Sequence, residues 1–310
     1  MRDNNFDIQE NMQLFKTVYD DQEVCSLVMD YIDKNYSNVK RFAKFLIKNK
    51  WRKLVDKQPL LILSAIALSL KTARLRFVDR GFDEQVFFDT MSDIKVWGED
   101  YRKKFNKVGL TEINWIRLHI NCLIFKIGRL QYQIGRYYFS PKTVIGNKKI
   151  SLGEKCYFIH IQRGGKLERQ DCIQSINLAA QLLKKIFPKI RTDVMMCHSW
   201  LLSSKNKNFV EPSSNIAQFA ALFENVGETQ SASGHFRWIF GIEEKEKTLK
   251  QNKESMGIYL NLSDFQHKNI MQTNAKNYIM NGGDLTDGKG IIIVDSICQN
   301  DKSNYKDDNI

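Results

Sequence analysis

The spacing of apolar residues changes partway along this chain, and that change constrains the fold more than any other feature. Between residues 6 and 88 the apolar positions recur every three or four residues, as Phe15, Val18 and Tyr19 do. That period is typical of amphipathic helices, and no strand-like alternation occurs before about residue 110. Within 128–139 the pattern alternates, with LQYQI at its centre, which indicates a half-buried strand.

The rest of the chain alternates between predicted strands and helices. We expect helices at 168–187 and 264–280, a short helix capped at 213–215, a helix stop at Gly109, and strands at 155–162, 192–202, 222–229, 236–241 and 290–296. This order predicts an α/β (α+β) protein, with a helical N-terminal region followed by a mixed sheet that carries helices on its faces. We expect domains at 1–127 and 128–298, and a disordered tail at 299–310.

The cysteine pattern and the longest apolar run exclude several classes of protein. Six cysteines occur without any C-x-x-C pair, which predicts buried free thiols and no metal site. The longest apolar run, 59–70, is shorter than the roughly 20 residues needed to span a bilayer. The polar, acidic start is unlike a secretory signal. Together these features predict a cytoplasmic protein with no membrane partner.

The net charge of +12 has three interpretations. It is compatible with nucleic-acid binding, with an anionic small-molecule partner such as a nucleotide-bearing cofactor, or with a lysine-rich solvated surface. We expect no nucleic-acid partner. Basic residues concentrate at 41–57, where apolar residues are interleaved at helical spacing. That segment is predicted either as an amphipathic helix with snorkelling side chains or as a binding face.

The first candidate site is the turn between the predicted strand 155–162 and the helix that follows. It contains Arg163, Gly164, Gly165 and Lys166. Glycines between a strand and a helix let backbone N–H groups point at an anion, and the basic side chains add positive potential. The alternative is an ordinary turn that needs a positive φ angle. Neither the P-loop nor the G-x-G-x-x-G fingerprint occurs.

The second candidate is the segment CHSWLL (197–202) at the end of a predicted strand. Strand alternation would place His198 and Trp200 on one face and Ser199 on the other. An imidazole there could accept a proton from an attacking amine, and the serine hydroxyl could donate to a substrate. The alternative is a structural histidine. A Cys–His or Ser–His nucleophile is disfavoured, because neighbours in one strand point in opposite directions and no G-x-S-x-G elbow occurs.

Two further groups complete the candidates. His160 lies on the predicted strand 155–162, so if this strand pairs with 192–202, His160 and His198 face one crevice. Arg129 and Gln131 are predicted to share a strand face and to contact substrate, with an exposed strand face as the alternative.

The residues that carry a family resemblance are spread over about 85–295. In the first half they are Asp89–Ile94 (DTMSDI), Trp97, Gly109, Leu110, Trp115 and Gly128–Tyr132 (GRLQY). In the second half they are His160, Ile161, Gly164, Gly165, Leu167, Cys197–Leu202, Ser214–Ile216, Phe219, Phe240, Gly241, Gly282 and Gly283. This set resembles a bacterial acyltransferase family that joins an N-acyltransferase N-terminal domain to a GNAT-like C-terminal domain.

The resemblance implies a GNAT-like fold and transfer of an acyl group from acyl-CoA, or a similar thioester, to an amine. It implies acyl-CoA as co-substrate and no metal. Arg163, Gly164, Gly165 and Lys166 would then bind the pyrophosphate. His160, His198 and Ser199 would be catalytic, with Arg129, Gln131 and Trp200 at the substrate.

The sequence departs from the family pattern in two loops. Ser203-Ser204 stand where the family has Asp-Pro, and Lys166 stands where a proline is common. The R/Q-x-x-G-x-G/A pattern is also missing. A non-catalytic ligand-binding or regulatory protein on the same fold is therefore the alternative function.

Overall fold

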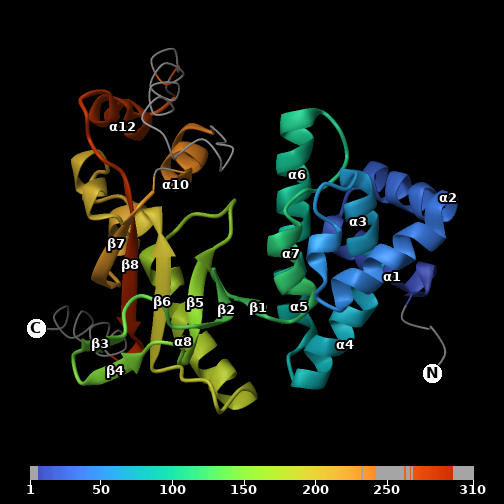
Figure 1. Ribbon diagram of the computed structural model, residues 1–310, viewed down its shortest axis with the longest axis horizontal. Coiled ribbons are helices and arrows are strands. Elements are labelled where there is room, and N and C mark those ends of the chain that lie inside the picture. The colour runs from blue at the N-terminus through green and yellow to red at the C-terminus, as the bar shows by residue number, and fades with distance from the viewer. Residues whose placement is uncertain (1–5, 232, 242–261, 263–265, 267, 296–310) are drawn as a thin grey trace, which may run out of the picture. The chain divides into compact units, whose positions relative to one another are not determined.

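The computed structural model describes residues 6–231, 233–241, 262, 266 and 268–295 (Figure 1). Its internal contacts divide the chain into two units, and strands β2 and β5 contribute residues to both. Unit 1 consists of Met1–Ile134, His160–Gly165 and Lys185–Pro188, and unit 2 of Gly135–Ile159, Lys166–Lys184 and Lys189–Ile310. The predicted boundary at residue 127 stays a prediction. Cys298 and the predicted tail at 299–310 lie outside the described residues.

Unit 1 is mainly helical up to Ile120, which confirms the predicted helical lead. Its helical elements are α1 (Ile8–Tyr19), α2 (Gln22–Ile47), the 3-10 turn η2 (Trp51–Lys53), α3 (Pro59–Ala67), α4 (Leu70–Arg80), α5 (Glu84–Met91), α6 (Asp93–Phe105) and α7 (Ile113–Ile120). Asp7, Asp21 and Asp83 start α1, α2 and α5, because each carboxylate accepts a hydrogen bond from a backbone N–H in the first turn. Pro59 begins α3 in its first turn, as expected.

The predicted helix stop at Gly109 is wrong. Helix α6 ends at Phe105, and Asn106 caps it in the left-handed conformation with φ of 49°. Asparagine tolerates that conformation because its short polar side chain bonds locally. Gly109 is needed for a different reason, since a Cβ there would collide with Pro59.

Aromatic rings pack the core of unit 1. The Phe77 ring lies 5.5–5.9 Å from the rings of Phe82, Phe87 and Phe125, and Phe82 stacks on Phe125 at 4.5 Å. Phe125 belongs to a strand that the sequence pattern did not predict, β1 (Ile124–Ile127). It pairs antiparallel with β2 (Leu130–Arg136) through a turn at Gly128, whose φ is +64°.

Unit 2 is organised around four strands in the order β5-β6-β8-β7. Its elements, including strand residues shared with unit 1, are β3 (Lys142–Ile145), β4 (Lys148–Ser151), β5 (Lys155–Ile161), α8 (Arg169–Ile186), β6 (Val194–Ser199), η3 (Trp200–Leu202), η4 (Ser204–Asn208), α9 (Asn215–Ala220), β7 (Glu224–Gln230), α10 (Ser233–His235), η5 (Phe236–Phe240), α12 (Ile270–Met280) and β8 (Thr286–Ile293). Strands β5 and β6 are parallel, whereas β8 is antiparallel to β6 and to β7. This confirms the predicted mixed sheet.

Two predicted strands need correction. Strand β6 ends at Ser199, and the three residues after it form a 3-10 turn. Residues 236–240 form a π-helical turn that ends at the left-handed Gly241, not a strand. Phe236, Ile239 and Phe240 all enter one buried cluster. Positions i, i+3 and i+4 can share a face only in a helical turn, so burial selects that conformation.

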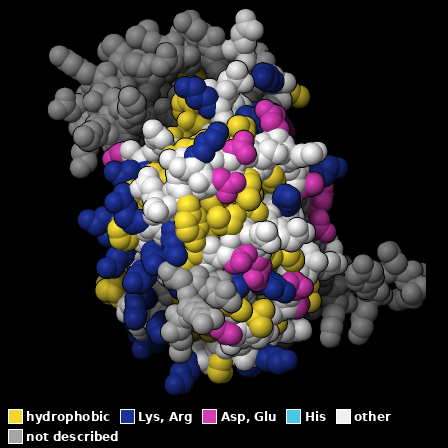
Figure 2. Space-filling model, turned by 90° about the vertical axis from the view of Figure 1, so that its right-hand side faces the viewer, with side chains coloured by type: hydrophobic (Ala, Val, Ile, Leu, Met, Phe, Trp, Pro, Cys, Tyr) yellow, Lys and Arg dark blue, Asp and Glu magenta, His cyan; other side chains and the backbone are white. Residues whose placement is uncertain are grey.

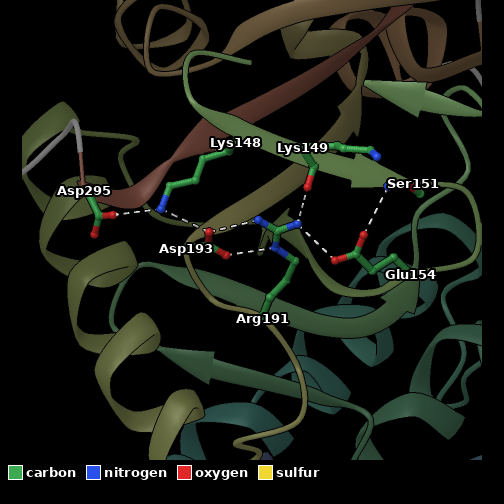
Figure 3. A network of polar contacts seen from close by, with 7 residues as sticks. All are labelled: Lys148, Lys149, Ser151, Glu154, Arg191, Asp193 and Asp295. Carbon is green, nitrogen blue, oxygen red and sulfur yellow. Dashed lines mark hydrogen bonds and ion pairs between the residues drawn. The ribbon is translucent and has the colours of Figure 1, made fainter. Parts of the chain in front are cut away.

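An ion-pair network holds the β3–β4 hairpin to the start of β6 (Figure 3). The Arg191 guanidinium donates to both Asp193 oxygens, at 2.9 Å each, and to a Glu154 oxygen at 3.0 Å. Lys148 on β4 lies 3.2 Å from Asp193 and 3.4 Å from Asp295. Hydrogen bonds from Arg191 are the main cause that lowers the pKa of Asp193 to about 2. The network ties three chain segments together.

Among the described helices, none is long and apolar enough to cross a membrane. The five cysteines at positions 25, 122, 156, 172 and 197 are all buried and unbridged, which confirms the prediction for these five. The side of the molecule that carries α1 and α2 is shown in Figure 2, where Lys and Arg side chains gather along the left of the view.

Candidate active site

His198 lies at the end of β6 in unit 2, and both of its ring nitrogens contact hydroxyl groups. Nδ1 lies 2.8 Å from the Tyr138 phenol oxygen, and Nε2 lies 2.9 Å from Thr229 Oγ1. Thr229 Oγ1 in turn donates to the Asp287 carbonyl oxygen at 3.4 Å. When the Thr229 proton points to that carbonyl, Thr229 accepts from His198 Nε2–H and Nδ1 accepts from Tyr138. This assignment corresponds to the neutral Nε2–H tautomer.

The surroundings of His198 favour this neutral form. Burial is the main cause that lowers the pKa of His198, and Lys289 adds to the effect while Asp287 opposes it. The partner Tyr138 is 51% exposed, yet burial of its hydroxyl end raises the pKa of its phenol. Tyr138 therefore stays protonated and donates to an imidazole able to accept a proton. The arrangement offers a short proton path from the surface to His198.

The other predicted residues of this segment have structural contacts. Ser199 Oγ accepts a hydrogen bond from the backbone N–H of Leu201 at 3.2 Å and so starts the η3 turn. Trp200 follows the end of the strand, so strand alternation does not set its direction as predicted. Its ring packs against His235 at 5.3 Å and against the cluster that holds Phe209. These contacts fix the turn that follows His198.

The buried side chain of Asn206 stabilises the η3 turn through hydrogen bonds to its carbonyl oxygens. Asn206 donates to the carbonyl oxygens of Trp200 and Leu201, at 2.8 and 3.2 Å, and its own oxygen lies 3.1 Å from His235 Nε2. On β8, a Cβ at Gly288 would collide with the Leu202 carbonyl, so only glycine lets the turn lie on this strand. Burial also raises the pKa of the Cys197 thiol to about 12, which keeps it a thiol and disfavours a nucleophile role.

Ser203 and Ser204, which stand where the family pattern has Asp-Pro, form hydrogen bonds with residues of β7 and β8. The Ser204 backbone N–H donates to Glu228 Oε1 at 2.7 Å, and Ser203 Oγ lies 2.8 Å from Thr286 Oγ1. Thr286 also donates to Glu228. A proline at 204 would have no N–H to give. The hydrogen bond to Glu228 therefore depends on having serine, and not the proline of the family pattern, at position 204.

His160 belongs to unit 1 and lies near the end of β5. Its Nε2 lies 2.8 Å from Gln133 Oε1, and its ring meets Trp115 edge-on at 4.9 Å. Burial first, and the nearby His119 second, lower the pKa of His160 to about 4, so it is neutral at pH 7. Because His198 lies in unit 2, the predicted crevice shared by the two imidazoles stays a prediction.

A buried carboxylate that the sequence analysis did not single out as a site residue centres this part of unit 1. Asp93, at the start of α6, is 2% exposed and accepts hydrogen bonds from Trp115 at 2.6 Å and from Gln131 at 3.2 Å. His119 Nε2 lies 3.0 Å from the same oxygen, and Gln162 donates to the other oxygen at 3.2 Å. Burial raises the pKa of Asp93, but these donors outweigh it and lower the pKa to about 2.

The predicted anion-binding turn begins directly after Gln162. Gly164 has φ of +102° and open space where a Cβ would lie, so this turn does need a positive φ. Arg129, in the turn before β2, donates to the Gln162 carbonyl at 3.1 Å and the Gly165 carbonyl at 2.7 Å. Arg163 pairs with Asp100 of α6. The structure thus connects Arg129 to the predicted turn.

The predicted shared strand face of Arg129 and Gln131 stays a prediction. Arg129 precedes the strand, whereas Gln131 is buried against Asp93. Sequence analysis also missed Tyr138 and Thr229 as the partners of His198. Tyr138 lies in the aromatic run RYYF, which was the only available signal. Within the described part of the chain, no three His, Cys, Asp or Glu side chains are placed to hold a metal ion.

Comparison with known proteins gives the family. Residues 4–122 match the N-acyltransferase N-terminal domain, and residues 124–292 match the GNAT-like C-terminal domain. No curated protein sequence matches significantly.

Among solved structures, an acyltransferase bound to CoA and 10C-teicoplanin superposes with a TM-score of 0.73 at 14% identity, covering 92% of this chain and 88% of that one. An acyltransferase bound to decanoyl-CoA has a TM-score of 0.70 at 15% identity with the same coverage. These likenesses confirm the GNAT-like fold, and the two domain matches show that the chain belongs to the family that joins an N-acyltransferase N-terminal domain to a GNAT-like C-terminal domain.

Proposed function

We propose that this chain transfers an acyl group from acyl-CoA to an amine. The observation that carries the proposal is the neutral His198 at the end of β6, hydrogen-bonded to the phenol of Tyr138, a side chain that is half exposed. Family membership and the acyl-CoA bound to structurally similar acyltransferases support the choice of donor. The acceptor is proposed as an amine because a neutral imidazole suits the removal of a proton from attacking nitrogen.

In the proposed step, the amine nitrogen attacks the thioester carbonyl carbon, a C–N bond forms and the C–S bond breaks. The amine proton moves to the Tyr138 oxygen while the phenol proton moves to His198 Nδ1. The departing thiolate then takes a proton back through the same path and leaves as CoA thiol. No external acid or oxidant is needed, and His198 returns to its neutral state.

The donor's pyrophosphate is proposed to bind the turn at Arg163, Gly164, Gly165 and Lys166. Gly164 lets the chain turn there with a φ of +102°, and nothing lies within 4 Å of where its Cβ would be. Arg129 holds two carbonyl oxygens of this turn and is thus proposed as a positioning residue in addition to its predicted substrate contact. Arg163 already pairs with Asp100, so we expect backbone N–H groups to contribute more than this guanidinium.

The remaining predicted site residues stay proposals with defined structural contacts. His160 and Ser199 are proposed as catalytic, and Gln131 and Trp200 as substrate contacts. The geometry gives each of them a supporting contact: Gln133 for His160, the Leu201 N–H for Ser199, Asp93 for Gln131 and His235 for Trp200. A cytoplasmic location is likewise proposed.

The direct test is a screen of acyl-CoA donors of increasing chain length against a panel of amines, with mass spectrometry of the products. We expect one or more acylated amines and stoichiometric free CoA. His198→Gln should lower the rate about 10²- to 10⁴-fold, the usual range for a general base. His160→Gln, at the other histidine proposed as catalytic, measures the contribution of that imidazole separately. Turnover unchanged by His198→Gln contradicts the proposed role.

The alternative, a non-catalytic binding protein, is favoured by the engagement of both His198 nitrogens. It predicts acyl-CoA binding without turnover for every amine. A thermal shift with acyl-CoA but no product across the panel would favour this alternative, whereas product formation that depends on His198 would exclude it.

A further inference from the structure

The second half of α2 carries a concentrated positive charge on the face that points away from the core. Helix α2 breaks at Asn35, whose φ of −132° is not helical. After the break, Val39, Phe42, Ala43 and Leu46 are buried at helical spacing. Residues 40–57 contain eight Lys or Arg and a single Asp. The predicted amphipathic helix over 41–57 holds only as far as Ile47, where α2 ends, and the 3-10 turn Trp51–Lys53 follows.

This cationic face is hollowed. A hollow of about 470 Å³ is lined by five basic side chains: Lys40, Arg41, Lys44, Lys48 and Lys50. Among the described residues, Ser37 and Phe45 complete its lining. From Lys40 to Lys48 the basic residues extend along roughly 12 Å of helix, at 1.5 Å per residue. The hollow is a short cationic trough.

Aromatic rings hold several of these cations close together. The Lys40 Nζ lies 5.6 Å from the centre of the Phe6 ring and 5.4 Å from that of Tyr36, and Lys44 Nζ lies 5.5 Å from Phe6. The Arg41 guanidinium lies 5.0 Å from the Phe42 ring and donates to Asn38. Holding like charges together raises the electrostatic potential of the hollow.

We propose that this hollow binds a small oligophosphate, the class of ligand with two or more linked phosphates. Five cations within one hollow match several negative charges on one compact molecule. Lysine and arginine are the usual side-chain partners of phosphate, and the Ser37 hydroxyl supplies a neutral donor. The concave shape favours a ligand that side chains can surround over a flat membrane or a long polymer. Figure 2 shows that Lys and Arg also gather more widely along the left of this view.

The inference does not rest on acyl transfer, since its residues are distinct from those proposed for the acyl donor. The test is calorimetric titration of the full chain with inorganic tripolyphosphate at fixed ionic strength. We expect one saturable site. Lys48→Ala/Lys50→Ala should weaken binding at least tenfold, because it removes two exposed cations from the lining. Lys103→Ala/Lys107→Ala, on exposed positions of the same unit, is the matched control and should change affinity less than twofold.

Lys48→Arg/Lys50→Arg keeps the charge and should retain binding. Equal weakening by the pocket and control pairs would show general charge attraction and overturn the site. Binding of duplex DNA or of anionic phosphatidylserine vesicles without binding of tripolyphosphate would overturn the proposed ligand class. Because acyl-CoA itself carries a pyrophosphate, the separate readout is the KM for acyl-CoA in the acyl-transfer assay. A parallel rise of that KM in the pocket pair would place the hollow within the donor site and overturn its independence.

Discussion

Asp93→Asn is the substitution whose consequence follows most directly from the structure. The Asp93 carboxylate is 2% exposed and faces donors on Trp115, Gln131 and Gln162, together with the His119 imidazole. An asparagine of the same shape has one oxygen and one NH₂ group, so at least one donor would face another donor. It also removes the negative charge beside His119.

The expected loss of stability has a lower and an upper bound. The pKa of Asp93 falls from 3.8 to about 2, which at about 1.4 kcal/mol per pKa unit corresponds to about 2 kcal/mol. Leaving a buried donor without its acceptor costs about 1–3 kcal/mol, so a site with several donors can lose up to about 5 kcal/mol. We therefore expect Asp93→Asn to lower the free energy of unfolding by about 2–5 kcal/mol at pH 7.

The pH dependence gives the sharper test. The pKa is lower in the folded state, so this contribution is fully present above the unfolded pKa of 3.8 and is lost as pH falls toward 2. The wild type should thus lose about 1 kcal/mol of it between pH 5 and pH 3, whereas Asp93→Asn should not. The difference in free energy of unfolding between the wild type and Asp93→Asn should therefore fall by about 1 kcal/mol between pH 5 and pH 3.

The assay is urea unfolding followed by tryptophan fluorescence and circular dichroism at pH 7, 5, 4 and 3. Asp79→Asn is the matched control, because it makes the same charge change at an exposed position of α4. It should alter stability by less than about 0.5 kcal/mol. A gap for Asp93→Asn that is equally small, or that does not narrow between pH 5 and 3, would refute the argument.

Four further outcomes are expected. Tyr138→Phe should lower kcat/KM of the acyl-transfer assay at least tenfold with little change in melting temperature, because it removes the phenol from the proton path; an unchanged rate would exclude the phenol. The pH–rate profile should lose activity as the pH falls through the lowered pKa of His198, and that acid limb should be absent in the residual activity of His198→Gln. Ser204→Pro should destabilise by about 1 kcal/mol in urea unfolding through loss of its N–H bond to Glu228, whereas Ser204→Ala, which keeps the N–H, should not. Arg191→Met should cost about 1–3 kcal/mol in the same assay, since it leaves two carboxylates without their shared guanidinium; a neutral effect would show that the network is dispensable.

Local patterns in the sequence were sufficient for most of the elements. The three-to-four-residue period predicted the helical lead, and the cap at Ser214 correctly placed the start of α9. The alternation in 128–139 correctly predicted β2. These predictions succeed because helix period, capping and strand alternation depend on neighbours in sequence. Residues 236–241 were mispredicted because a short apolar run has no clear period, and burial against distant residues chose its conformation.

The features of the candidate site also fall into those that local sequence predicts and those that depend on the tertiary structure. The sequence by itself determined the family-bearing segment with His198, the glycine turn at Gly164 and the cationic face of α2, since residue type and spacing suffice for these. Only the tertiary structure decided that Tyr138 and Thr229 flank His198 and that Arg129 holds the carbonyls of the glycine turn. The partners of His198 lie 60 and 31 positions away along the chain. Hydrogen bonds at such separations form only after strands pair and loops close, so no local pattern encodes them.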